Sequence, residues 1–319
     1  MGGRSQPVWP PTRTVRGAAA QERRHPVAKS LPGGRALRIA LDASVCRGPT
    51  LLETLAAVAD HGISAVQFHM GCVPGLEPLP AEVPPGVADA VRQACAATGV
   101  SLASLSGTYN MIDPDPLRRA EGTRRLGGLI AACPLLGVSI VTLCTGTRDP
   151  HSMWRPHRDN GSPAAWRDLV ASLDAVLPAA ERHGVTLALE PEVSNVVDSA
   201  VRARRLIDEL GSPCLRVCID GANLFHAGEL ARMPDVLDEA FSLLGRDIVL
   251  AHAKDLDRDG EAGSLPAGHG RLDYGRYLSL LAAAGFNGAV VLHGLAAGQI
   301  DDCAEFLAGH LRRIAASQA

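Results

Sequence analysis

The stretch HGVTLALE, residues 183–190, carries three signals that together predict a helix followed by a buried parallel strand. Gly184 follows a helix-like segment and suits the left-handed turn that commonly ends a helix. The apolar run after it has no polar face, as expected for a strand that is covered on both sides. The run stops at Glu190, and an acid has no structural reason to end such a strand unless that end opens onto a site.

The same order of helix, glycine and apolar run recurs along the chain. It is found again at HGISAVQF (61–68), TGVSLASL (98–105), LGVSIVTL (136–143) and AGFNGAVVL (284–292). Three more strands are predicted at LRIALDA (37–43), LRVCID (215–220) and DIVLAH (247–252). Helices are predicted at 50–60, 86–98, 117–135, 163–183, 198–210, 228–244, 273–284 and 299–316. Eight strands that alternate with eight helices predict a (β/α)₈ TIM barrel.

A doubly wound open sheet is the alternative architecture for this alternation. Such a sheet normally carries a glycine-rich phosphate turn after its first strand, and LDASVCRG (41–48) has none. Residues 1–35 are rich in Arg, Pro, Gly and Ala and show neither helical nor strand periodicity. We therefore expect a disordered basic tail at 1–35 and a single barrel domain at 36–319.

Composition excludes several classes of partner. The formal charge of −3 offers no extended basic surface, so nucleic acid is not expected. No apolar stretch approaches the roughly 18 residues of a membrane span. The eight cysteines are scattered without a CxxC pair, which favours buried thiols in a reducing cytoplasm over a disulfide framework. The expected partner is a small molecule.

Four of the predicted strands end on a potential metal ligand. The strand-end residues are Glu190, Asp220, His252 and His293. Because catalytic groups of (β/α)₈ barrels lie at the carboxyl ends of the strands, we expect these four side chains to meet. Two carboxylates and two imidazoles suit Mn²⁺, Co²⁺, Zn²⁺ or Fe²⁺. One such ion polarises a carbonyl and lowers the barrier to removing a neighbouring proton.

Several stretches resemble the sugar phosphate isomerase/epimerase family, whose members have the xylose isomerase-like barrel. They are SGTYNMID (106–113), CTGTRDP (144–150), MWRPHRDN (153–160), LALEPEVSN (187–195), CIDGANLF (218–225), AHAKDLD (251–257) and VVLHGL (290–295). The resemblance spans roughly residues 37 to 316. It implies one divalent ion, with Mg²⁺ added to the candidates, and an enzyme that is commonly a homo-oligomer.

The ketose 3-epimerases of that superfamily imply the roles of the ligands. They hold the metal with Glu, Asp, His and Glu after strands five to eight, which places Glu190, Asp220 and His252 as ligands. His293 stands where the second glutamate is expected, and both glutamates act as bases in those enzymes. The difference favours chemistry with one base, Glu190, while His293 remains a candidate ligand or proton carrier.

Other polar residues at strand ends are candidate pocket residues. We expect Lys254 and Asp255 to follow His252 in an HxKD turn, with the Lys254 ammonium stabilising a developing enolate oxygen. Asn223 stands where the superfamily often has a histidine. The remaining candidates for substrate binding are His69, Asn110, Arg148 and Glu192.

The function expected from this resemblance is a metal-dependent isomerase or epimerase. Its substrate would be a sugar, a sugar phosphate or a cyclitol, and its intermediate an enediolate. A lyase or dehydratase on a keto-sugar or inosose is the first alternative, as in the related inosose dehydratases. The second is a catalytically silent barrel that binds sugars. Endonuclease IV belongs to the same superfamily, but its multi-metal site needs more histidines at strand ends than this chain has.

Overall fold

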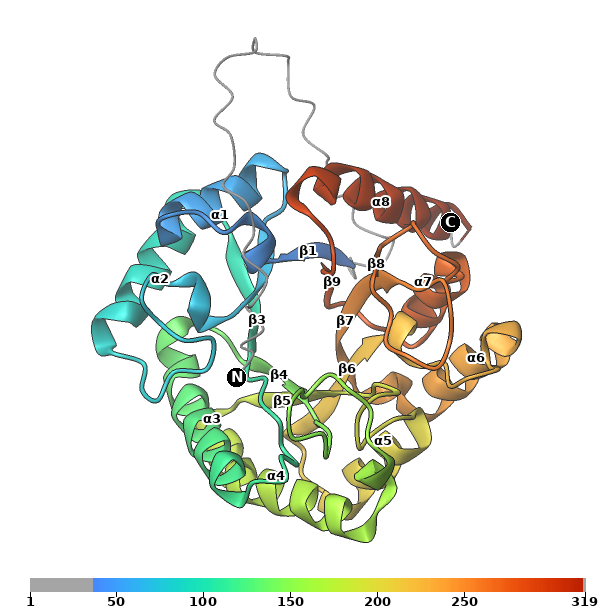
Figure 1. Cartoon of the computed structure of the whole chain (residues 1–319). Coiled ribbons are helices and arrows are strands. Elements are labelled where there is room, and N and C mark those ends of the chain that lie inside the picture. Colours follow the sequence, from blue (N-terminus) through green and yellow to red (C-terminus); the bar gives the residue numbers. More distant parts are fainter. Residues whose placement is uncertain (1–36, 318–319) are drawn as a thin grey trace, which may run out of the picture.

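Eight parallel strands close into a barrel in the computed structural model, which describes residues 37–317 (Figure 1). The barrel strands are β1 (Arg38–Asp42), β2 (Ala65–Phe68), β3 (Ser101–Ser106), β4 (Ile140–Cys144), β5 (Thr186–Glu190), β6 (Leu215–Asp220), β7 (Ile248–Asp255) and β9 (Ala289–Leu292). Neighbours in the chain pair in parallel, and β9 closes the ring by pairing with both β7 and β1. The predicted tail at 1–35 lies outside the described residues.

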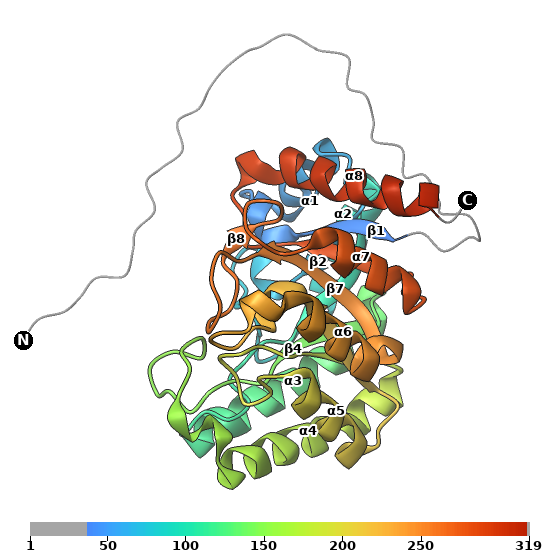
Figure 2. The ribbon, with the colours of Figure 1, turned by 90° about the vertical axis from the view of Figure 1, so that its right-hand side faces the viewer.

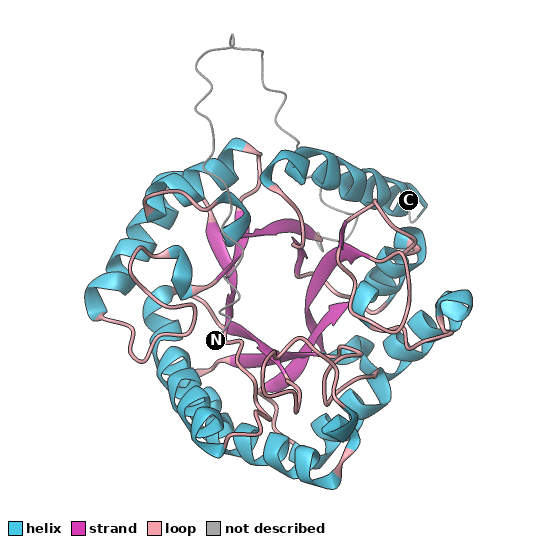
Figure 3. Ribbon diagram, viewed as in Figure 1, coloured by secondary structure: helices cyan, strands magenta, loops and turns pink. Residues whose placement is uncertain are grey.

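Within the described residues, eight α-helices surround the strands (Figure 3). They are α1 (Leu51–Asp60), α2 (Pro85–Thr98), α3 (Pro116–Leu136), α4 (Pro163–His183), α5 (Ala200–Leu210), α6 (Met233–Leu244), α7 (Tyr274–Ala283) and α8 (Ile300–Ser317). The predicted (β/α)₈ barrel is thereby confirmed. Thr50 and Glu53 form a capping box before α1, and Ser162 caps α4. The helix predicted to begin at residue 228 begins instead at Met233, because Pro234 favours the first helical turn.

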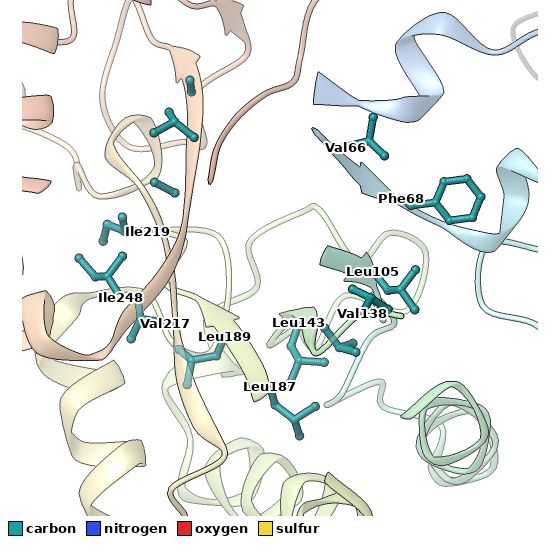
Figure 4. Packing of buried hydrophobic residues seen from close by; sticks show 14 of the residues in the cluster. Val66, Phe68, Leu105, Val138, Leu143, Leu187, Leu189, Val217, Ile219 and Ile248 are labelled. Carbon is teal, nitrogen blue, oxygen red and sulfur yellow. The ribbon is translucent and has the colours of Figure 1, made fainter. Parts of the chain in front are cut away.

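The wall of the barrel separates the apolar core into two clusters, one outside the strands and one inside the barrel. A large apolar cluster fills the space between strands and helices, and Figure 4 shows part of it, including Val66, Phe68, Leu187 and Leu189. A second cluster, made mostly of small residues, fills the barrel interior, namely Ala40, Ala65, Ala188, Cys218, Leu250, Ala289 and Val291. Since side chains alternate along a strand, the residue two positions after an interior one also faces inward. That rule carries the candidate ligands to the interior at the carboxyl ends of the strands.

Strand β7 is longer than predicted and includes Lys254 and Asp255, which were expected in a turn. The extension has a partner, since the short strand β8 (Leu265–Pro266) pairs antiparallel with these two residues. Figure 2 shows β8 at the end of the barrel where the loops that follow the strands gather. This pairing gives the backbone of Lys254 and Asp255 hydrogen-bond partners beyond the end of the barrel. Lys254 is therefore held in a strand.

Two tyrosines of α7 fix the backbone of β6 and β7 beneath the candidate ligands. The Tyr277 hydroxyl lies 3.0 Å from the carbonyl oxygens of both Ile219 and His252, and the Tyr274 hydroxyl donates to the Lys254 carbonyl at 2.8 Å. Both tyrosines are buried. A buried hydroxyl that pairs with strand carbonyls resists any shift in register, because moving it would leave polar groups unsatisfied.

No helix within residues 37–317 has both the length and the apolar character that a membrane span requires. All eight cysteines lie within this described part and are free thiols. This agrees with the expectation that the cysteines do not form a disulfide framework.

Gly270 provides a test of how the loop after β7 is held. A Cβ at this position would overlap the Asp255 carboxylate and the Leu256 carbonyl oxygen. We expect Gly270→Ala to destabilise the protein by about 1–3 kcal/mol, as overpacking does. Gly127→Ala is the matched control, because that helical glycine has open space around it, and it should stabilise by about 0.5–1 kcal/mol. Denaturant unfolding measures both, and equal effects would contradict this account of the loop.

Candidate metal centre

The four predicted ligands come together in the barrel interior. Glu190 Oε1 lies 3.2 Å from His252 Nδ1, and His293 Nε2 lies 3.1 Å from Asp220 Oδ2. The rings of His252 and His293 have centroids 4.4 Å apart. Strands β5, β6 and β7 contribute one residue each, and His293 follows β9 directly. The expectation that these residues would meet at one end of the barrel agrees with this geometry.

Asp220 lies at the centre of the group and is fully buried. Its Oδ1 accepts from the backbone of Ala222 at 2.9 Å, while Lys254 Nζ lies 3.5 Å from Oδ2. Burial opposes the charged carboxylate, but the Lys254 ammonium and the bond from His293 hold the pKa of Asp220 well below its usual range. Burial likewise opposes the charge of Lys254, yet Asp220 and Glu190 raise the pKa of this amine. The two groups therefore remain ionised together.

His252 has a partner at each ring nitrogen. Nδ1 faces Glu190, and Nε2 lies 2.9 Å from Oε1 of Gln67, a β2 residue that sequence reasoning missed. Burial lowers the pKa of His252, but the adjacent Cys218 and Glu190 side chains outweigh it and raise that pKa well above its usual value. Gln67 gave one signal in the sequence. It is the polar residue inside the apolar run AVQF, with the alternation that points inward.

Glu190 and Glu192 differ in charge state although they are two residues apart. Asn223 donates to Glu190 Oε1 at 2.8 Å. Burial opposes ionisation of Glu190, but His252 attracts the carboxylate and lowers its pKa. Within residues 37–317 no histidine contacts Glu192, and burial together with the charge of Glu190 raises the pKa of Glu192 to about 7. Glu190 is thus a charged carboxylate like Asp220, whereas Glu192 is a carboxyl group that gains or loses its proton near neutral pH.

The side chains fit a divalent cation. One ligand atom from each of Asp220, His252 and His293 lies within 4.8 Å of the other two. Glu190 is not part of that three-residue group, although its Oε1 contacts His252. Burial of charged oxygen and imidazole nitrogen atoms around a common point is the donor chemistry that first-row divalent ions prefer. Three residues, Asp220, His252 and His293, can therefore each offer one ligand atom to an ion, and Glu190 lies beside them.

Two of the predicted substrate-binding residues have their polar groups engaged in loop structure. The Asn110 amide donates to the Thr147 carbonyl at 2.8 Å and accepts from the Thr147 backbone at 3.0 Å. The Arg148 guanidinium donates to the Ile112 carbonyl and pairs with Asp168. These contacts tie the loops after β3 and β4 to each other, so they do not support a role for either residue in substrate binding.

Within residues 37–317, neither Asp255 nor His69 forms a hydrogen bond or ion pair with the four candidate ligands. Asp255 is on the opposite face of β7 from His252, and its carboxylate accepts from three backbone amides, those of Leu256, Gly268 and Leu272. The carboxylate thereby anchors the loop after β7. His69 follows β2 and is half-buried, with Nε2 3.7 Å from the Cys72 sulfur. Its Nδ1 has no hydrogen-bond partner within residues 37–317.

Known proteins share this architecture. A D-tagatose 3-epimerase-like protein aligns with a TM-score of 0.69 and 14% identity, over 89% of this chain and 100% of the other. A 3-keto-D-glucoside 4-epimerase from E. coli gives a TM-score of 0.64 and 18% identity, over 86% and 99%. A xylose isomerase-like TIM barrel protein from Mycobacterium smegmatis, solved in complex with magnesium, gives 0.66 and 17%, over 89% and 98%. At these identities the alignments establish the fold.

A family model establishes more than the fold. The model described as the xylose isomerase-like TIM barrel matches residues 55–309, which extend from α1 to α8. The matched region includes all the side chains that meet at Asp220. The resemblance seen in the sequence motifs is confirmed, and the chain belongs to the xylose isomerase-like TIM barrel family.

Proposed function

We propose that the protein is an isomerase or epimerase that uses one divalent metal ion and acts on a sugar, sugar phosphate or cyclitol. The observation that carries the proposal is the group of buried Asp220, buried His252 and half-buried His293, with Glu190 and Lys254 in contact with it. The epimerases named among the similar structures support the reaction class. The structure solved with magnesium supports a divalent ion.

The residues of this chain suit the movement of a proton next to a carbonyl. Asp220, His252 and His293 would hold the ion, with Glu190 as a further ligand, and the ion would supply the Lewis acidity that polarises the carbonyl. Glu190 is a carboxylate held by Asn223 and His252, so it can accept the proton. The Lys254 ammonium is a fixed positive charge that favours the negative oxygen formed in an enediolate.

His293 affects how many proton-accepting groups the site provides. Its bond to Asp220 directs the imidazole toward the ligand group, and burial followed by repulsion from His252 lowers its pKa. A neutral imidazole is a competent metal ligand, and once its Nε2 lone pair is given to an ion that nitrogen could no longer accept a proton. This favours transfer of the proton by one carboxylate base, Glu190, which fits aldose–ketose isomerisation and also elimination of water. A lyase is therefore the second candidate.

The test of the function is a panel of ketoses, aldoses, sugar phosphates and inososes incubated with Mn²⁺-supplemented protein in deuterated water. An isomerase or epimerase gives a product of unchanged composition that carries solvent deuterium. A lyase gives a product that has lost water. Glu190→Gln should abolish deuterium incorporation, while Glu239→Gln on the exposed face of α6 should retain it. Incorporation at the wild-type rate in Glu190→Gln would exclude Glu190 as the base.

Asp220 provides a test of the metal centre itself. Asp220→Asn keeps the shape of the side chain but removes the buried charge, so the affinity for Mn²⁺ or Zn²⁺ should fall about tenfold or more. Isothermal titration calorimetry measures the change. Asp257→Asn removes an exposed carboxylate that follows the neighbouring strand β7 and should bind the ions like the wild type. Unchanged affinity in Asp220→Asn would exclude Asp220 from coordination.

Glu192 provides a test of the electrostatics in metal-free protein. Its pKa of about 7 exceeds the ordinary 4.5, so the folded state holds the proton more tightly than the unfolded chain does. The wild type should therefore lose stability relative to Glu192→Gln as pH rises from about 4.5 to about 7, by about 3 kcal/mol at most. Unfolding in urea with a chelator present measures this. A constant difference between about pH 5 and pH 8 would contradict the buried, protonated carboxyl group.

A further inference from the structure

We propose that Gln67 is a positioning residue that fixes the tautomer of His252 and thereby sets the affinity of the site for a divalent ion. The inference rests on the proposed metal centre. Gln67 belongs to β2, which is separated from β7 by β1 and β9 in the barrel order. Its side chain crosses the barrel interior, and its Oε1 lies 2.9 Å from His252 Nε2. It is 7% exposed, so water does not readily replace it.

The orientation of the Gln67 amide is held from the neighbouring strand. Ser104 on β3 is fully buried, and its hydroxyl donates to Gln67 Oε1 at 3.4 Å. The register of β2 against β3 shifts between Val66 and Gln67, so that Gln67 pairs with Ser104. An irregularity of this kind redirects a side chain. Here it places the amide oxygen so that it accepts from both Ser104 and His252.

Because the Gln67 amide oxygen can only accept, the His252 Nε2 that faces it must carry the hydrogen. The other nitrogen, Nδ1, lies 3.2 Å from Glu190 Oε1 and 3.9 Å from Asp220 Oδ2, on the side where the ligand atoms converge. With the hydrogen fixed on Nε2, the lone pair of a neutral His252 points from Nδ1 toward the ion. Partners of this kind fix the orientation of metal-binding histidines and change metal affinity by about 10–100-fold when removed.

Gln67 fixes the tautomer of His252 without adding a charge to the site. A buried carboxylate at the same place would also accept from Nε2, but it would add a third anion to a group that already contains Glu190 and Asp220. The amide supplies the hydrogen-bond acceptor alone. Two substitutions therefore separate its contributions, since Gln67→Met removes the acceptor at similar size and Gln67→Glu retains it.

The test is a calorimetric titration of the full-length variants with Zn²⁺ and Mn²⁺. Gln67→Met should bind both ions about 10–100-fold more weakly than the wild type. Gln67→Glu should restore most of that loss. Thr142→Val is the matched control, because Thr142 is also a buried polar strand residue but donates to the Leu105 carbonyl outside the ligand group, and it should bind as the wild type does. Thermal melting of each variant confirms that the fold is intact.

Long-range ¹H–¹⁵N spectra of the Zn²⁺-loaded wild type provide a second readout that requires no variant to fold. They should show His252 with its hydrogen on Nε2 and the metal on Nδ1, and the opposite arrangement would overturn the proposal. Wild-type affinity in folded Gln67→Met would overturn the role of Gln67 and leave the metal centre standing. Absence of ion binding by the wild type would overturn both the metal centre and the role of Gln67.

Discussion

The buried negative charge of Asp220 is the constraint on which the rest of the site depends. A carboxylate without exposure to water persists only when it is paired and hydrogen-bonded, because the cost of removing an ion from water is several kcal/mol. Its partners are His293, Lys254 and the backbone of Ala222. They come from three different parts of the chain. The charge is therefore stable only if β6, β7 and β9 keep their register.

The register of these strands is secured from outside the barrel. Tyr277 on α7 donates toward carbonyls of both β6 and β7, and Tyr274 donates to Lys254. The antiparallel pairing with β8 continues β7 beyond His252, so Lys254 projects inward from a strand and not from a turn. A site built on strands holds its groups more firmly than one built on loops. That firmness suits stabilisation of a charge that develops during reaction, since the surrounding dipoles need not reorganise.

Strands β2 and β3, on the other side of the barrel, also contribute to the hydrogen-bond network of the site. Gln67 on β2 reaches His252, and Ser104 on β3 supports Gln67, so the hydrogen-bond network spans the interior. Small side chains such as Ala65 and Ala188 below this level leave the space in which the longer polar side chains meet. The loops after β3 and β4 follow a different pattern. There Asn110 and Arg148 are used to join one loop to the other.

The barrel and the four residues that meet inside it could be predicted from the sequence alone. Glycine at five helix–strand junctions and apolar runs without a polar face specify local structure, and an acid or histidine at the end of such a run has few structural explanations, so Glu190, Asp220, His252 and His293 were identified as candidates. Tertiary structure alone decided which polar groups are free to act. The Asp255 carboxylate bonds to backbone amides up to 17 residues away, Arg148 bonds to a carbonyl 36 residues away, and Gln67 meets His252 185 residues away. Contacts of that range follow from barrel closure and strand register, which no local pattern encodes.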